Sequence, residues 1–110
     1  GEWKVYIASS NIQANDSYAY PNPFSPAQEQ RVGIKYLLSS DSDVTIRIMN
    51  FGMDLVKVLR QNAPRKIGEQ LEYWDGTNEL GELVINGVYF YRIDSDALSE
   101  PLFGKIMVLK

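Results

Sequence analysis

The side chains that could do chemistry in this sequence are carboxylates, because histidine and cysteine are both absent. Their absence excludes Ser-His-Asp and Cys-His nucleophilic systems, thiolate and histidine metal sites, disulfides and redox pairs. Catalysis by two carboxylates stays open on composition alone, since Asp and Glu together number 14. No pair of them stands in a recognisable catalytic constellation. We therefore expect no catalytic residue, no cofactor and no enzymatic activity.

Three acidic groups carry the oxygen ligands that a calcium ion requires. They are Asp41 with Asp43, Asp94 with Asp96, and Asp75 with Asn78 and Glu79. None has the spacing of a known calcium loop, and Asp-Ser-Asp is ordinary hairpin-turn chemistry. We therefore expect these residues to form turns and expect no metal site.

Length and charge narrow the class of protein further. A chain of 110 residues fits one domain, and 45% apolar residues suffice for a core. A net charge of −3 with mixed signs gives no electrostatic argument for nucleic acid or an anionic membrane surface. No apolar run approaches the length of a spanning helix, so we expect no membrane insertion. We expect a monomer.

Short β-rich runs separated by turn residues predict an all-β protein. The candidate strands are residues 3–7, 31–38, 43–50, 54–60, 69–74, 87–94 and 103–110. The connections between them include 61–68, and residues 80–86 are expected to form an irregular edge, with a helical turn as the alternative. This spacing predicts an antiparallel two-sheet sandwich of about seven strands, like an immunoglobulin or fibronectin III domain. Alternation predicts that Val32, Ile34, Ile46, Ile48, Trp74 and Tyr89 are buried between the sheets.

The stretch SYAYPNPFSP, residues 17–26, carries three prolines and can be neither a helix nor an internal strand. Prolines pre-set an extended backbone, so Phe24 and Tyr20 can lie against the sandwich at a small cost in chain entropy. We predict a stiff clasp that leads into the first strand of the sandwich. A proline-rich ligand for a partner's aromatic groove is the alternative.

Two further motifs are read as structural. The motif Trp74-Asp75-Gly76 predicts a core tryptophan at a strand end, followed by a turn in which Gly76 takes positive φ and Asp75 caps backbone donors. A stacking platform for a sugar is the alternative role of the tryptophan. In the strand that follows, Tyr89 and Tyr91 share one face, and a buried tyrosine hydroxyl needs a partner, often a loop backbone group.

Taken in order, these motifs resemble the immunoglobulin-like domain named after the flagellar hook-capping protein FlgD. They also resemble the type A C-terminal sorting domains of proteins exported by the type IX secretion system. The motif residues that carry the resemblance are Pro21, Asn22, Pro23, Phe24, Trp74, Asp75, Gly76, Gly87, Tyr89 and Tyr91. The resemblance implies a FlgD-like sandwich domain at residues 18–110, and residues 1–17 as an N-terminal strand or a linker from a preceding region.

In sorting domains the terminal residues form part of what the export apparatus reads. The resemblance therefore implies a recognition element made of Gly104, Lys105, Ile106, Met107, Val108, Leu109 and Lys110. We expect Gly104 to free this strand from the preceding loop and the two lysines to discourage indiscriminate pairing at an edge. The apparatus could read the strand by strand addition, through the lysines, or through the sandwich edge as a whole.

The function implied by the resemblance is that of a non-catalytic C-terminal module of a larger exported protein, acting in sorting or attachment at the cell surface. Its partners would be the secretion or surface-attachment machinery and the parent polypeptide upstream. It would pass through the periplasm to the outer-membrane surface or the medium. Two alternatives stay open, an accessory carbohydrate-binding module with a polysaccharide partner and a structural spacer. A carbohydrate-binding module should show two or three coplanar, solvent-exposed aromatic residues on one sheet.

Overall fold

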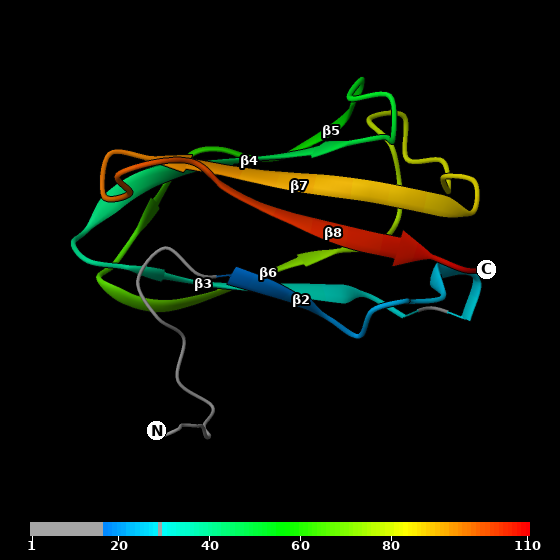
Figure 1. Ribbon diagram of the computed structural model, residues 1–110, viewed down its shortest axis with the longest axis horizontal. Helices are drawn as coiled ribbons and strands as arrows, with labels where there is room; N and C mark the ends of the chain where they lie inside the picture. Colours follow the sequence, from blue (N-terminus) through cyan, green and yellow to red (C-terminus); the bar gives the residue numbers. More distant parts are fainter. Residues whose placement is uncertain (1–16, 29) are drawn as a thin grey trace.

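The computed structural model describes residues 17–28 and 30–110, which form a two-layer antiparallel β-sandwich (Figure 1). One sheet has the strand order β2-β3-β6 and the other the order β5-β4-β7-β8. The elements are β2 (Ser17–Tyr20), the 3-10 helix η1 (Pro26–Gln28), β3 (Val32–Leu38), β4 (Ser42–Met49), β5 (Leu55–Arg65), β6 (Gly68–Trp74), β7 (Gly87–Ser95) and β8 (Leu102–Val108). The predicted all-β sandwich is confirmed. No helix in the described ranges is long and apolar enough to cross a membrane.

The predicted strands from residue 31 onward correspond to β3 through β8. The first candidate, residues 3–7, lies outside the described residues. In addition, β2 pairs with β3 just ahead of the first proline of the clasp. As an edge strand it agrees with the prediction that this stretch cannot be an internal strand. Residues 80–86 contain no helix and form only an isolated bridge between Thr77 and Leu83, so the irregular edge is confirmed.

The prediction that residues 61–68 form a connection is wrong for its first part, because β5 continues to Arg65. Pro64 is on β5, which is an edge strand of its sheet, and it lies opposite Asp43 of β4. A proline on an edge can leave its missing N–H on the open side, so it does not break the ladder. Asn62 takes a left-handed φ of 49°, and the β4–β5 register shifts between Val44 and Ile46. Residues 61–65 therefore form a bulged extension of β5 rather than a loop.

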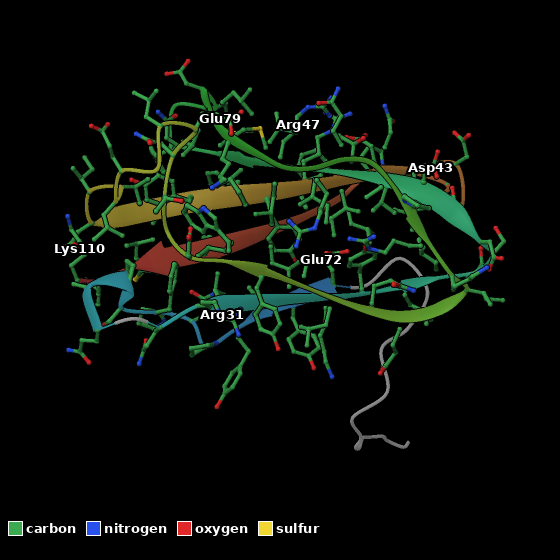
Figure 2. The ribbon with its side chains drawn as sticks, turned by 180° about the vertical axis from the view of Figure 1, so that it is seen from behind. Arg31, Asp43, Arg47, Glu72, Glu79 and Lys110 are labelled. Atoms are coloured by element: carbon green, nitrogen blue, oxygen red, sulfur yellow. The ribbon has the colours of Figure 1, made fainter. Side chains whose placement is uncertain are left out.

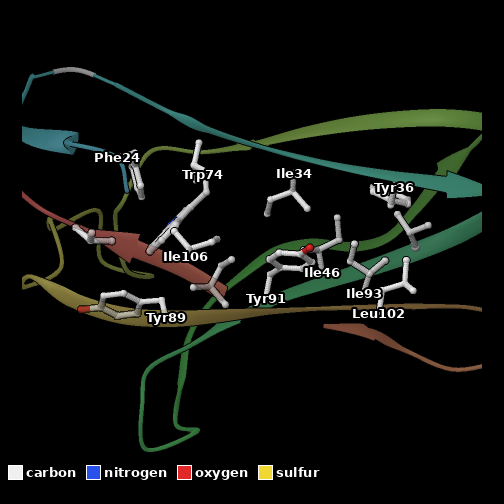
Figure 3. Packing of buried hydrophobic residues seen from close by; sticks show 14 of the residues in the cluster. Phe24, Ile34, Tyr36, Ile46, Trp74, Tyr89, Tyr91, Ile93, Leu102 and Ile106 are labelled. Atoms are coloured by element: carbon white, nitrogen blue, oxygen red, sulfur yellow. The ribbon is translucent and has the colours of Figure 1, made fainter. Parts of the chain in front are cut away.

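The core lies between the sheets and follows the alternation of the strands (Figure 3). All six side chains predicted to be buried are buried. The remaining buried apolar side chains are Phe24, Tyr36, Leu38, Val44, Val84, Tyr91, Ile93, Leu102, Ile106 and Val108. Because the two inner faces supply nearly all of these residues, the core is a single layer that runs along the sandwich.

At one end of the core, Trp74 packs between Phe24 and Tyr89. The centroid of the indole ring lies 5.7 Å from that of Phe24, in a tilted geometry, and 5.7 Å from that of Tyr89, in a T-shaped geometry. Its Nε1 donates a hydrogen bond to the carbonyl oxygen of Thr77 at 2.9 Å, so the one polar atom of the indole is satisfied. The predicted role of Trp74 as a core residue at a strand end is confirmed, and its role as a sugar platform is wrong because it is fully buried.

The turn after Trp74 also follows the prediction. Gly76 has a positive φ of 84°, and a Cβ there would lie 2.7 Å from the Cβ of Pro26. Asp75 Oδ1 accepts hydrogen bonds from the Thr77 hydroxyl at 2.6 Å and from the Thr77 N–H at 3.1 Å. The hydroxyl bond is the main cause that lowers the pKa of Asp75. The turn is thus fixed by its own side chains and by contact with the clasp.

A buried carboxylate, Glu72, bridges the side of the sandwich where β5 and β6 lie (Figure 2). Its side chain is 3% exposed. It accepts hydrogen bonds from the Tyr36 hydroxyl at 2.8 Å and from Arg65 Nε and Nη2 at 2.7 and 3.0 Å. Arg60 Nε lies 3.1 Å from Oε1 of Glu72. We call these four residues the Glu72 cluster.

The contacts in the Glu72 cluster offset the free-energy cost of burying the charged Glu72 carboxylate. Burial alone raises the pKa of Glu72, but the hydrogen bonds from Arg65 and Tyr36, with the charges of both arginines, outweigh it and lower the pKa overall. Burial and the contact with Glu72 raise the pKa of the Tyr36 hydroxyl. Glu72 is therefore ionised and Tyr36 neutral in the folded protein at neutral pH.

Replacing Glu72 with glutamine should destabilise the fold in a pH-dependent way. A carboxyl whose pKa is depressed by folding stabilises the protein above its unfolded pKa, about 4.3 for Glu, and loses that contribution as pH falls through the folded pKa. We expect Glu72→Gln to lower the free energy of unfolding by about 3 kcal/mol at pH 7, because a buried ion cluster then keeps its arginines without their counter-ion. The difference from wild type should shrink at pH 3, as measured by urea denaturation.

The matched control is Glu69→Gln, an exposed carboxylate on the same strand. It should change the free energy of unfolding by less than about 0.5 kcal/mol at either pH. A Glu72→Gln deficit of the same size at pH 7 and pH 3 would contradict an ionised Glu72.

Candidate functional site: the C-terminal strand

Alternate side chains of β8 point to opposite faces. Leu102, Ile106 and Val108 are buried in the core. Phe103, Lys105, Met107, Leu109 and Lys110 are exposed. The predicted recognition element is therefore split, since Ile106 and Val108 hold the strand in place and the odd-numbered residues with Lys110 meet solvent.

Gly104 lies within β8 and provides space for a tyrosine. It pairs across the strands with Tyr91, and a Cβ on Gly104 would lie 2.1 Å from Tyr91 Cζ. The tyrosine ring thus crosses the backbone of β8, and its hydroxyl bonds the Ser17 hydroxyl of β2 at 2.6 Å. Burial raises the pKa of the Tyr91 hydroxyl. The prediction that Gly104 frees the strand from the preceding loop is wrong, because its role is to let Tyr91 connect the two sheets.

The outer edge of β8 is covered by part of the clasp, residues 22–25. Asn22 uses both ends of its amide there: Nδ2 donates to the Lys105 carbonyl at 2.8 Å, and Oδ1 accepts from the Met107 N–H at 2.8 Å. One side chain thus satisfies two backbone groups of an edge strand.

Phe24 continues the same contact with its backbone. Its N–H donates to the Met107 carbonyl at 3.0 Å, and its carbonyl accepts from the Leu109 N–H at 3.0 Å. Phe24 and Val108 form a parallel bridge. The Ser25 hydroxyl donates to the Leu109 carbonyl at 2.6 Å. The clasp therefore pairs with β8 like a short additional strand.

This pairing bears on one of the predicted modes of recognition. From the Lys105 carbonyl to the Leu109 carbonyl, each backbone group on the outer edge of β8 has a partner in the clasp. Strand addition needs unpaired N–H and C=O groups. A partner strand could therefore add to this part of β8 only by displacing the clasp, whereas recognition through the lysines or through the sandwich edge as a whole needs no such change.

The end of the chain is held by a second asparagine. Asn86 Oδ1 accepts a hydrogen bond from the Lys110 N–H at 2.8 Å. Lys110 lies at the tip of the sandwich beyond β8, with its side chain exposed (Figure 2). The two lysines are thus carried on a fixed backbone.

The other predicted motif residues lie around this end of the sandwich. Gly87 opens β7, and the Tyr89 hydroxyl donates to the Ile85 carbonyl at 2.8 Å, so the predicted loop backbone partner is confirmed. Pro21 and Pro23 each follow a cis peptide bond. Tyr20 was predicted to lie against the sandwich, and this is wrong: its side chain is 74% exposed, because the alternation of β2 turns it to the outer face.

The acidic groups considered for calcium have partners within the protein. Asp41 accepts a hydrogen bond from the Ile67 N–H at 2.8 Å, and Asp94 pairs with Arg47 at 3.1 Å and Arg92 at 2.9 Å. Within residues 17–28 and 30–110, no group of three or more His, Cys, Asp or Glu side chains could hold a metal ion.

Sequence reasoning missed two parts of this arrangement. Glu72 stands two residues before Trp74, so its position on the inner face was readable from the alternation of β6. The clasp contacts of Asn22 and Ser25 join residues 83 to 85 positions apart. No local signal marks such contacts.

Comparisons with known proteins support the fold alone. No family model matches the sequence, and no curated protein matches it. The chain is similar in structure to part of PorZ, described as an essential bacterial surface component of the type IX secretion system of human oral-microbiomic Porphyromonas gingivalis. That match has a TM-score of 0.61 and 19% identity, and covers 86% of this chain and 11% of PorZ. It is also similar to part of dimeric latent PorU from Porphyromonas gingivalis, with a TM-score of 0.58 and 23% identity, covering 86% of this chain and 9% of PorU.

Adding one methyl group at Gly104 should separate the two sheets where Tyr91 crosses β8. We expect Gly104→Ala to lower the free energy of unfolding by about 1–3 kcal/mol, because the Tyr91 ring must leave its position and its bond to Ser17. Gly52→Ala is the matched control, since a Cβ there meets no atom closer than 3.5 Å. Urea denaturation of both variants measures the difference. Equal stability of the two variants would contradict the packing role of Gly104.

Proposed function

We propose that this domain is a non-catalytic C-terminal module of a larger exported protein, acting in sorting or attachment at the cell surface in connection with type IX secretion. The fold supports this proposal, because it is shared with a segment of PorZ, a surface component of that system. The chain spans about a tenth of PorZ and of PorU, which fits a module within a longer protein. The motif resemblance to sorting domains points the same way.

The observation that carries the proposal is the exposed side-chain row of β8. Phe103, Lys105 and Met107 of β8, with Leu109 just beyond it, are exposed on the outer face of the sheet, where alternate residues stand about 7 Å apart. The clasp closes the backbone beneath this row and Asn86 fixes its end. A partner would meet a rigid line of apolar and cationic side chains, which suits recognition at low entropic cost.

The chemistry of the domain supports a non-catalytic role. Histidine and cysteine are absent from the sequence. Two of the carboxylates, Glu72 and Asp94, are engaged by arginines. The expected partners are the secretion or surface-attachment machinery and the parent polypeptide upstream, with passage through the periplasm to the outer-membrane surface or the medium. The module acts as a monomer.

Charge reversal at both lysines tests this proposal. Lys105→Glu with Lys110→Glu should cost less than about 1 kcal/mol of stability, because both side chains are exposed. We expect the parent protein to fold normally and to remain in the periplasm instead of reaching the surface. Immunoblots of periplasmic and surface fractions measure the outcome.

The matched control is Lys57→Glu on β5 with Lys66→Glu in the turn after β5, which changes the net charge equally at positions outside β8. Lys57 gives up a hydrogen bond to Thr77 and Lys66 an exposed ion pair with Asp41, so the melting temperature of this variant is measured alongside. The control should reach the surface. If the Lys105 and Lys110 variant reaches the surface at the same level as the control, the lysines are not read and the proposal fails in this form.

A further inference from the structure

The outer face of the β2-β3-β6 sheet carries a hollow of about 460 Å³ that plays no part in the proposed recognition by β8. It lies on the opposite sheet from β8, so it is separate from the proposed recognition row. Two cross-strand rows build it. One is Tyr20–Gly33–Tyr73, and the other is Tyr18–Lys35–Leu71. The two rows lie on the same face of the sheet because they are two residues apart on each strand. The exposure of their tyrosines shows that this is the outer face.

Gly33 forms the floor between two tyrosines. A Cβ there would lie 3.0 Å from Leu71 Cδ1 and 3.4 Å from Tyr73 Cε1, so even alanine would crowd the space. A glycine inside a strand weakens the sheet and often marks a close approach by a ligand. Here the approaching groups are the Leu71 and Tyr73 side chains, which cover Gly33, and the hollow lies over this part of the sheet.

The tyrosine rings are open to solvent. Tyr18 is 46% exposed, Tyr20 74% and Tyr73 41%. Exposed aromatic residues gathered on one sheet face are unusual on a soluble protein and indicate a binding surface. Tyrosine suits such a surface, since it offers a rigid apolar ring with a polar end at a small entropic cost.

Two cationic side chains line the hollow. The Arg31 guanidinium lies over the Tyr73 ring, 4.2 Å from its centroid, and Lys35 stands in the middle of the second row. Within residues 17–28 and 30–110, the side chains that line the hollow include no Asp or Glu, and the exposed carboxylate of Glu69 lies one cross-strand row away, opposite Leu37. The hollow therefore favours an anionic ligand with flat apolar faces.

We propose that this hollow binds an acidic oligosaccharide, in which a sugar ring lies on Tyr20, the most exposed of the three tyrosines, and a carboxylate pairs with Arg31 or Lys35. The C–H faces of a pyranose ring match an exposed aromatic ring, and a uronic acid adds the anion. An extended peptide fits less well, because β3 is hydrogen-bonded on both sides by β2 and β6 and its face offers no backbone groups. Single-stranded nucleic acid fits less well because, in the part of the chain that the structure describes, two cations line the hollow, which is few for a phosphate backbone.

A titration of the 110-residue chain with a galacturonic acid hexasaccharide, followed by NMR shifts and calorimetry, tests this inference. We expect saturable binding that weakens as salt is added, because the ion pairs are exposed. Tyr20→Ala and Arg31→Gln should each weaken binding at least about tenfold, which corresponds to the loss of one good contact. Phe51→Ala and Lys66→Gln are matched controls on other surfaces, and they should bind within about twofold of wild type.

Several outcomes would overturn the inference. One is the absence of saturable binding at millimolar hexasaccharide, and another is unchanged binding in Tyr20→Ala or Arg31→Gln. Equal binding of a neutral glucose hexasaccharide would remove the acidic ligand class, and equal binding of oligothymidylate would assign the hollow to stacked bases. None of these results bears on delivery to the surface, which depends on β8.

Discussion

The hydrogen bonds between the clasp and β8 are the interaction on which the rest of this structure depends. Residues 22–25 reach across from the β2-β3-β6 sheet and pair with the last strand of the other sheet. The same contact carries Phe24 into the core beside Trp74, whose indole N–H fixes the next turn. One short segment thus joins the sheets, completes the core and closes an edge that would otherwise be open to pairing.

The two open sides of the sandwich are closed by different chemistry. On the β8 side the clasp uses backbone pairing and one asparagine, with no charge. On the side of β5 and β6 the Glu72 cluster uses a buried carboxylate held by two arginines and a tyrosine. A backbone contact keeps its strength with pH, whereas an ion cluster weakens in acid. The domain should therefore loosen first at the Glu72 cluster when it is acidified.

Features of this fold that depend on neighbouring residues could be predicted from the sequence, and features that depend on contacts between distant residues could not. Alternation is local, so it identified β3, β4 and β7 and the buried positions from Val32 to Tyr89. The strand character of residues 61–65 was not predictable, because Asn62 and Pro64 read as a turn until their place on an edge strand is known. Gly104 was misread for the same reason, since its need for space comes from Tyr91 on the neighbouring strand. The clasp was expected from its prolines, but its pairing with β8 joins distant parts of the chain.

The central claim is that the clasp closes the backbone edge of β8, so that the strand is recognised by its side chains. Hydrogen exchange of the Phe24, Met107 and Leu109 amides tests it most directly, because each donates across this contact. We expect these amides to exchange as slowly as those of the internal strand β7, since they open only with the fold. Exchange as fast as that of the exposed loop amides of Ser39 and Ser40 would mean that the edge is open to a partner strand, and would contradict this account.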